Sequence, residues 1–191
     1  MDKFKIIRDA LNGVKVIELM PMTDDRGFFE RLLCVNEFKE LGLERDIVNI
    51  NHSKTSLAGT IRGMHYQNQP SAEIKIVKCI RGAIHDVVVD IRQNSPTFLK
   101  YFSIDLTSDN NLLLYIPEGF AHGFQALEDD SEIIYFVTSH YSKELEATLN
   151  PFDCSINIKW PVDCTKISNK DKESLILTSS FEGIEERSSN A

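Results

Sequence analysis

Short runs of β-branched and aromatic residues, separated by turn residues, dominate the chain between residues 13 and 138. The runs recur roughly every 8–12 residues, a spacing typical of antiparallel β-sandwiches and barrels. A parallel sheet would need a long crossover, normally a helix, between consecutive strands, and the gaps here are too short. The sequence therefore predicts an all-β protein, an antiparallel jelly-roll, with strands over residues 13–19, 73–80, 83–91, 101–106, 112–116 and 132–138.

Helix is predicted only in short pieces at the ends of the jelly-roll. Asn36 can cap a helix over residues 37–41, and Ser142 can cap another over residues 143–149 that ends before Pro151. A third piece is expected around residues 170–178. Because 191 residues, 42% of them apolar, suffice for one core, we expect residues 1–180 to form a single domain and residues 181–191 a polar, frayed tail.

Acidic residues outnumber basic ones, 29 against 21, and the formal net charge is −8. This argues against a nucleic-acid or anionic-membrane binder, although a local basic pocket for a phosphate group stays possible. We find no apolar run long enough for a bilayer span and no signal-peptide pattern at the N-terminus. The four cysteines form no C-x-x-C pair. We therefore expect reduced thiols and a cytoplasmic protein.

Two segments combine polar side chains in an unusual way. Thr60-Ile-Arg-Gly-Met-His-Tyr-Gln67 puts a cation and an imidazole, Arg62 and His65, in one strand-length segment. The alternative for these residues is an exposed strand face. Ile116-Pro-Glu-Gly-Phe-Ala-His-Gly-Phe124 places His122 between glycines, where a ligand could approach the backbone. The alternative there is a hairpin whose glycines serve only the turn.

Two further candidates share a strand face with apolar side chains. Lys75 has the same parity as Val77, and an inward lysine is costly without a partner or ligand, unless it snorkels at a strand edge. Tyr135 has the parity of Ile133 and Val137, where a core tyrosine with a bonded hydroxyl is the alternative. Both residues are candidates for a site inside the fold.

Several kinds of site have no sequence pattern here. Closely paired Cys and His ligands for zinc are missing, and the His-x-His pair of metal-binding cupins does not occur at His65, so no metal is expected. No glycine-rich phosphate loop precedes a helix, and no G-x-S-x-G element occurs.

Seven motifs follow one another along residues 25–171. They are Asp25-Arg-Gly-Phe-Phe29, Asn51-His-Ser53, Arg62-Gly-Met-His-Tyr-Gln67, Val88-Val-Asp-Ile-Arg92 with Ser95-Pro-Thr97, Ile116-Pro-Glu-Gly-Phe-Ala-His-Gly-Phe124, Trp160-Pro161 and Ser168-Asn-Lys-Asp171. With these motifs in this order, the chain resembles the dTDP-4-dehydrorhamnose 3,5-epimerase family of nucleotide-sugar epimerases. The resemblance implies a jelly-roll homodimer that acts on a nucleotide-activated 4-keto-6-deoxy sugar without a metal or organic cofactor.

The resemblance also implies roles for individual residues. The catalytic base corresponds to His65 and its orienting carboxylate to Asp171, the enolate-stabilising lysine to Lys75, and the tyrosine that delivers a proton to the opposite face to Tyr135. The residues implied in substrate binding are Arg26, Asn51, Arg62, Gln67, His122, Glu146 and Lys170.

The chemistry of these residue types suits such a reaction. A ketone acidifies the C–H bonds on both neighbouring carbons, and inverting such a centre needs a base on one face, an acid on the other and a group that holds the enolate. An imidazole oriented by a carboxylate is a suitable base near neutral pH. An ammonium beside the ketone oxygen would stabilise the enolate, and Arg26 and Arg62 would neutralise a diphosphate.

The sequence also departs from the family pattern. Arg31 stands where members carry Glu, Asn49-Ile50 replaces Gln-Asp, Phe136 replaces Lys, and Ala147 and Pro151 replace Arg and Trp. Since none of these is a proposed proton-transfer residue, we expect retained chemistry with altered nucleotide or sugar selectivity. The alternatives are a single-centre epimerase acting on a CDP- or other nucleotide-linked sugar, a 3,4-ketoisomerase, and a non-catalytic sugar-nucleotide binding module.

Overall fold

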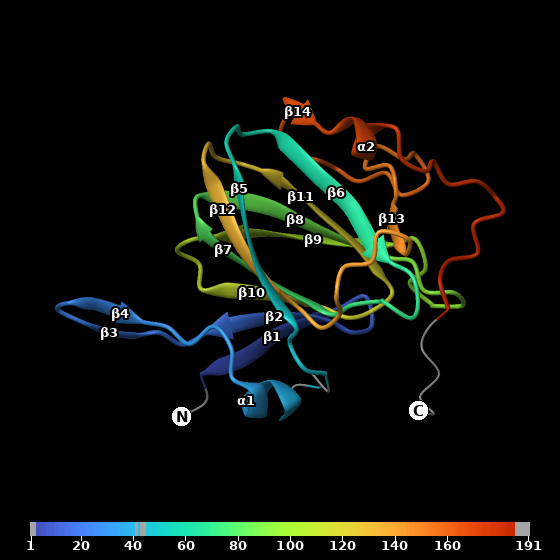
Figure 1. The fold of residues 1–191 in the computed structure, drawn as a ribbon. Helices are drawn as coiled ribbons and strands as arrows, with labels where there is room; N and C mark the ends of the chain where they lie inside the picture. The colour runs from blue at the N-terminus through green and yellow to red at the C-terminus, as the bar shows by residue number, and fades with distance from the viewer. Residues whose placement is uncertain (1–2, 41, 43–44, 186–191) are drawn as a thin grey trace.

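Two antiparallel sheets pack against each other to form the body of the protein (Figure 1). The computed structural model describes residues 3–40, 42 and 45–185. In spatial order, the first sheet contains β1 (Phe4–Ala10), β2 (Val14–Leu19), β10 (Leu112–Ile116), β7 (Lys75–Arg81), β12 (Ser131–Val137) and β5 (Asn49–Thr55). The second contains β13 (Glu146–Thr148), β6 (Thr60–Gln67), β11 (Phe120–Ala126), β8 (Ala83–Asp90) and β9 (Tyr101–Thr107), and β14 (Lys166–Ile167) pairs in parallel with β6. The predicted all-β, jelly-roll class is confirmed.

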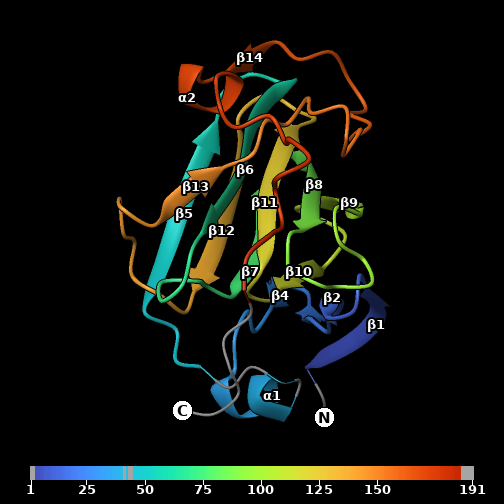
Figure 2. The ribbon, with the colours of Figure 1, turned by 90° about the vertical axis from the view of Figure 1, so that its right-hand side faces the viewer.

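Three small elements lie outside the two sheets. A hairpin of β3 (Met22–Asp24) and β4 (Gly27–Phe29) stands away from the body (Figure 1). Helix α1 (Val35–Glu40) lies at the opposite end of the molecule from α2 (Asn169–Lys172), which is close to β14 (Figure 2). The helix predicted over residues 37–41 is therefore present, but it begins at Val35, so Asn36 lies inside it and does not cap it. Residue 41 lies outside the described residues.

Strand alternation divides the apolar residues among three clusters. Val77 and Ile133 belong to a cluster to which both sheets contribute, so they face the interior of the sandwich. Their strand neighbours Ile76 and Phe136 belong instead to a cluster with Phe38 of α1, on the outer face of the first sheet. A third cluster covers the outer face of the second sheet with residues of the C-terminal segment. Because Lys75 and Tyr135 share the parity of the inward set, their predicted inward direction follows from this division.

The six strands expected from the sequence occur as β2, β7, β8, β9, β10 and β12, with ends shifted by at most a few residues. The helix predicted over residues 143–149 is wrong: Glu146–Thr148 forms β13 and pairs with β6. Pairing satisfies backbone groups of β6 that would otherwise form a free sheet edge, and this outweighs the helix propensity of the segment. The helix expected around residues 170–178 is limited to α2, where the Ser168 hydroxyl accepts a hydrogen bond from the Asp171 N–H.

The predicted tail is partly wrong, because its first residues contact the body of the protein. Phe181 stacks on Phe98 at a ring-centroid distance of 6.1 Å, and Ile184 exchanges backbone hydrogen bonds with Ile91 and Gln93 at 2.7 and 2.8 Å. Residues 186–191 lie outside the described residues. Within the described part of the chain, no helix has the length and apolar character needed to cross a membrane.

Candidate active site

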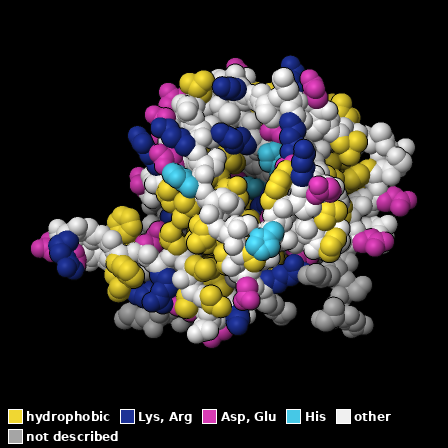
Figure 3. Space-filling view, viewed as in Figure 1, with side chains coloured by type: hydrophobic (Ala, Val, Ile, Leu, Met, Phe, Trp, Pro, Cys, Tyr) yellow, Lys and Arg dark blue, Asp and Glu magenta, His cyan; other side chains and the backbone are white. Residues whose placement is uncertain are grey.

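A cavity of about 510 Å³ lies between the two sheets. Strands β5, β7 and β12 of the first sheet and β6 and β11 of the second contribute to its walls, and residues 166–171 close one side. On the surface, Figure 3 shows a hollow with histidine inside it and lysine and arginine side chains gathered around its rim. Seven predicted site residues line the cavity: Arg62, His65, Lys75, His122, Tyr135, Lys170 and Asp171.

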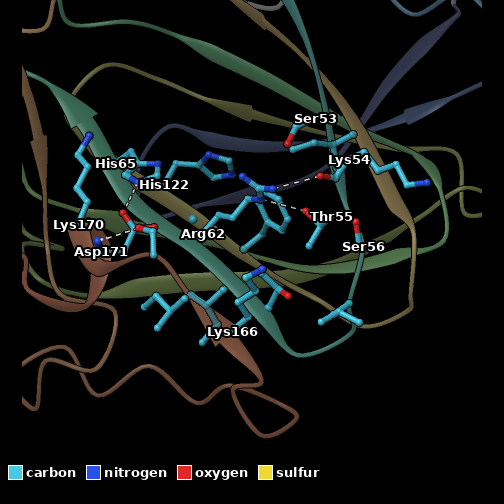
Figure 4. Close-up of a pocket in the computed structure, with 18 of the residues that line it drawn as sticks. Ser53, Lys54, Thr55, Ser56, Arg62, His65, His122, Lys166, Lys170 and Asp171 are labelled. Atoms are coloured by element: carbon cyan, nitrogen blue, oxygen red, sulfur yellow. Dashed lines mark hydrogen bonds and ion pairs between the residues drawn. The ribbon is translucent and has the colours of Figure 1, made fainter.

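His65 and Asp171 form a hydrogen-bonded pair across the cavity wall (Figure 4). The His65 Nε2 lies 2.7 Å from the Asp171 Oδ1, and the other carboxylate oxygen accepts the Gly63 N–H at 3.3 Å. Burial would raise the pKa of Asp171, but the hydrogen bond and charge of His65, with the Gly63 and Ser168 contacts, together lower that pKa below its ordinary value. Asp171 is therefore an ionised partner that orients the imidazole of His65.

Lys75 reaches the cavity from the first residue of β7. Its ammonium is 3.2 Å from the Glu73 Oε1 and 3.5 Å from the carbonyl oxygen of His65. The side chain is 11% exposed, so this cation is largely removed from water. The Glu73 carboxylate compensates the charge, as a buried ammonium requires.

Tyr135 lines the same cavity from β12. Burial raises the pKa of its phenol, the negative charge of Glu73 raises that pKa further, and the positive charge of Arg62 opposes the shift. The phenol is therefore protonated at neutral pH and can donate a proton. His65 and Lys75 meet in one cavity with Tyr135, which is distant from both in the sequence, as the proton-transfer hypothesis requires.

Arg62 and Lys170 supply positive charge at the cavity. Arg62 donates from Nε to the Thr55 hydroxyl at 3.0 Å and from Nη2 to the Lys54 carbonyl at 3.1 Å (Figure 4). The Lys170 ammonium is 2.6 Å from the Glu146 Oε2. Glu146 does not line the cavity itself and instead contacts a cation that does. Its pKa would be raised by burial, but hydrogen bonds from Lys170 and Tyr141 lower it overall.

His122 forms a second imidazole–carboxylate pair with Asp86. The sequence motifs included His122 but not its partner. Its Nε2 lies 2.6 Å from the Oδ1 of Asp86, a carboxylate with no exposed surface. In the β11–β6 register, His122 is directly opposite His65. Asp86 could have been found by the parity argument used for Lys75, since it lies between the inward-facing Ile84 and Val88.

Besides Glu146, three predicted binding residues do not line the cavity. The Gln67 side-chain amide donates to the Ser71 and His140 carbonyls and its oxygen accepts the Ser142 N–H, so this side chain supports a loop. Asn51 lies on β5 opposite Tyr135 in the register, but does not line the cavity. Arg26 is at the turn of the protruding hairpin, 85% exposed and paired with Asp24.

The departures from the family pattern also lie away from the cavity lining. Arg31 pairs with Glu37 at 3.1 Å, Phe136 is buried in the outer cluster with α1, and Ile50 is exposed on β5. The lining itself thus gives no support to altered selectivity. Among the described residues, no three His, Cys, Asp or Glu side chains are grouped so that they could hold a metal ion.

Comparisons with known proteins point to one family. The family model described as dTDP-4-dehydrorhamnose 3,5-epimerase matches residues 8–179. A dTDP-4-dehydrorhamnose 3,5-epimerase of Shigella flexneri is 42% identical over 167 residues, which cover 87% of this chain and 92% of that protein.

Solved structures agree with the sequence comparison. The Bacillus anthracis enzyme of the same description, crystallised with TDP and PPi, superposes with a TM-score of 0.89 at 36% identity and covers 91% of this chain and 99% of its own. A Legionella pneumophila 3,5-epimerase in complex with dTDP-4-keto-L-rhamnose superposes at 0.85 and 35% identity, covering 90% of this chain and 91% of its own. With the match spanning nearly the whole sandwich and the residues that line its cavity, the chain belongs to the dTDP-4-dehydrorhamnose 3,5-epimerase family.

Proposed function

We propose that this protein is an epimerase that inverts C5, and also C3, of a dTDP-linked 4-keto-6-deoxyhexose by proton transfer. The observation that carries the proposal is the meeting of His65–Asp171, Lys75 and Tyr135 in one cavity of a family member. Its relatives are named as 3,5-epimerases, and one of them holds dTDP-4-keto-L-rhamnose. The proposed activity is that of an isomerase acting on a carbohydrate. It needs no organic cofactor, as the resemblance to the family implies.

His65 is the proposed base. Its imidazole removes the proton from the carbon beside the ketone, and the buried, ionised Asp171 stabilises the imidazolium that forms. The pair is fixed before substrate arrives, because Asp171 is itself held by the Gly63 N–H and by α2. No reorganisation of the base is then needed during proton removal.

Lys75 is the proposed stabiliser of the enolate. Removing the proton moves negative charge onto the ketone oxygen. The Lys75 ammonium, which is largely shielded from water in the cavity wall, would stabilise this negative charge. Comparable hydrogen-bond donors contribute about 3–4 kcal/mol to transition-state stabilisation. Tyr135 then returns a proton to the opposite face of the carbon, which its raised pKa permits because the phenol is protonated.

The nucleotide diphosphate is assigned to the basic side of the cavity. Arg62 and Lys170 are its proposed contacts, and His122 contacts the sugar side, since these three side chains line the cavity. Glu146 acts through Lys170. Asn51 remains a proposed contact, because it has the same parity on β5 as Ser53 and Thr55, which line the cavity, and is opposite Tyr135 in the register.

The experiment is incubation with dTDP-, CDP- and GDP-4-keto-6-deoxyhexoses in deuterated water, followed by NMR of the ring positions. We expect deuterium at C5 and C3 with inverted configuration, and the fastest reaction with the dTDP sugar. Exchange at one centre only would identify a single-centre epimerase. A carbonyl displaced to C3 would replace the proposal by ketoisomerisation, and nucleotide binding without any exchange would reject catalysis.

We also infer a homodimer, supported by the protruding hairpin. Phe28 and Phe29 are 70% and 57% exposed there, and apolar side chains on a projecting element indicate a protein interface. Arg26 lies in the same hairpin, away from the cavity of its own chain. In a dimer, this predicted substrate-binding residue could instead reach the cavity of the second copy.

We further propose that the protein works in the cytoplasm. All four cysteines, Cys34, Cys79, Cys154 and Cys164, are free thiols in the structure. Unpaired thiols, two of them exposed, suit a reducing compartment. Fractionation of cells that express the protein, with a thiol-labelling assay, tests this.

A further inference from the structure

Lys75 has a neighbour that none of the sequence motifs includes. Glu73, two residues earlier, extends its carboxylate to 3.2 Å from the Lys75 ammonium, and the Glu73 side chain is only 13% exposed. The carbonyl oxygen of His65 is the second acceptor, at 3.5 Å. An ammonium has three donors, so these two contacts leave one N–H for a group inside the cavity that Lys75 lines.

Glu73 also acts on the proposed acid. Its charge raises the pKa of Tyr135 in addition to the effect of burial, against the opposing charge of Arg62. One carboxylate is therefore linked to two of the groups that face the cavity. A neutral acceptor in its place could still hold the ammonium by a hydrogen bond, but could not exert this effect on the phenol.

We propose that Glu73 is a positioning residue of the reaction, which holds the Lys75 ammonium so that its remaining N–H points to the ketone oxygen of the sugar. It also delays ionisation of the Tyr135 phenol as pH rises, so that the acid remains competent. This inference rests on the proposed function, since it takes the epimerisation as the reaction that Lys75 and Tyr135 serve.

Three variants separate the effect of the Glu73 charge from the effect of its side-chain length. Glu73→Gln keeps the length and the acceptor but removes the charge, and Glu73→Asp keeps the charge on a shorter side chain. Glu182→Gln is the matched control, because it removes the same charge from an exposed residue near the C-terminus. Each is assayed for kcat and KM between pH 6 and pH 10, with the dTDP-4-keto-6-deoxy sugar as the probe.

For Glu73→Gln we expect kcat to fall about tenfold or more with KM little changed, because the ammonium is held less firmly beside the reacting oxygen. The sign of the pH effect follows from charge. Without the Glu73 carboxylate the phenolate is less unfavourable, the pKa of Tyr135 falls, and activity is lost at a lower pH than in the wild type. Glu73→Asp should keep the alkaline limb of the wild type, and Glu182→Gln should match the wild type throughout.

A second measurement works without turnover. Ultraviolet difference titration, with Tyr135→Phe subtracted, follows ionisation of the Tyr135 phenol directly and should show the same shift in Glu73→Gln. An unchanged titration and an unchanged kcat in Glu73→Gln would overturn the inference, as would equal alkaline shifts in Glu73→Gln and Glu73→Asp. A wild type with no ring-proton exchange would instead reject the proposed function, while the titration would still decide whether Glu73 controls the phenol.

Discussion

At the scale of single residues, the chemistry depends on what each ionisable group touches. Asp171 is 4% exposed and has His65 Nε2 at 2.7 Å. An asparagine there would keep the volume but lose the charge, and its amide nitrogen could face the imidazole and select the wrong tautomer. We expect Asp171→Asn to reduce kcat by roughly three to four orders of magnitude with a folded protein, as seen when such an orienting carboxylate is neutralised.

The measurement is kcat from steady-state kinetics, with circular dichroism to verify folding. Asp163→Asn, at an exposed position, is the matched control and should retain wild-type kcat. A kcat for Asp171→Asn within about tenfold of the wild type would show that His65 needs no anionic partner.

The same carboxylate affects stability as pH changes. The pKa of Asp171 in the folded protein lies below its ordinary value of 3.8, so the unfolded chain takes up the proton first. Its contribution to stability is complete above the unfolded value and is lost as pH falls through the lower folded value. Urea unfolding between pH 7 and pH 3 should therefore show a steeper loss of unfolding free energy in the wild type than in Asp171→Asn. Equal slopes would contradict this linkage.

At the scale of elements, the close approach of β6 and β11 decides where the site residues lie. Gly63 has a φ of +126°, and a Cβ at this position would come within 2.5 Å of the Gly123 Cα and 2.8 Å of the His122 carbonyl oxygen. Both contacts are backbone atoms that cannot move aside easily. The two glycines thus bring the strands that carry His65 and His122 close together.

We expect Gly63→Ala to destabilise the protein by about 1–3 kcal/mol through this overlap. Gly27→Ala is a close control, because Gly27 has the same φ of +126° but no atom within 4 Å of the added Cβ. The difference between the two unfolding free energies isolates the steric contact from backbone strain. Equal losses in both variants would mean that strain alone determines the effect.

The strands also show which features local sequence patterns could predict and which they could not. The inward direction of Lys75 and Tyr135 was predicted from period-two alternation, which depends only on neighbours within a strand. The helix predicted over residues 143–149 failed because Glu146–Thr148 pairs with β6, about eighty residues away in sequence. This pairing exists only in the folded sheet, so a pattern within residues 143–149 could not predict it.

At the scale of the whole molecule, the hairpin of β3 and β4 stands away from the body (Figure 1). Its Phe28 and Phe29 side chains are exposed. If a second copy covers it, replacing Phe28 and Phe29 together by serine should remove the apolar contact and give a monomer. Each phenylalanine is expected to contribute about 1.5–3 kcal/mol when buried.

Sedimentation velocity across a range of protein concentrations measures this. Ile176→Ser is the control, since Ile176 is 64% exposed but lies on the C-terminal segment, and it should leave a dimer. A wild type that sediments as a monomer at all concentrations, or a double variant that remains a dimer, would contradict the proposed assembly.

The sequence by itself determined the strand content, the inward face of the site strands and, through its ordered motifs, the family and the residues His65, Lys75, Tyr135 and Asp171. These follow from alternation and from motifs, which are properties of contiguous segments. The tertiary structure alone decided the distant partners: Asp86 beside His122, and the His140 and Ser142 contacts that occupy the Gln67 side chain. The physical reason is that a side-chain pair depends on the register of strands and the packing of sheets, which bring together residues that local sequence does not relate.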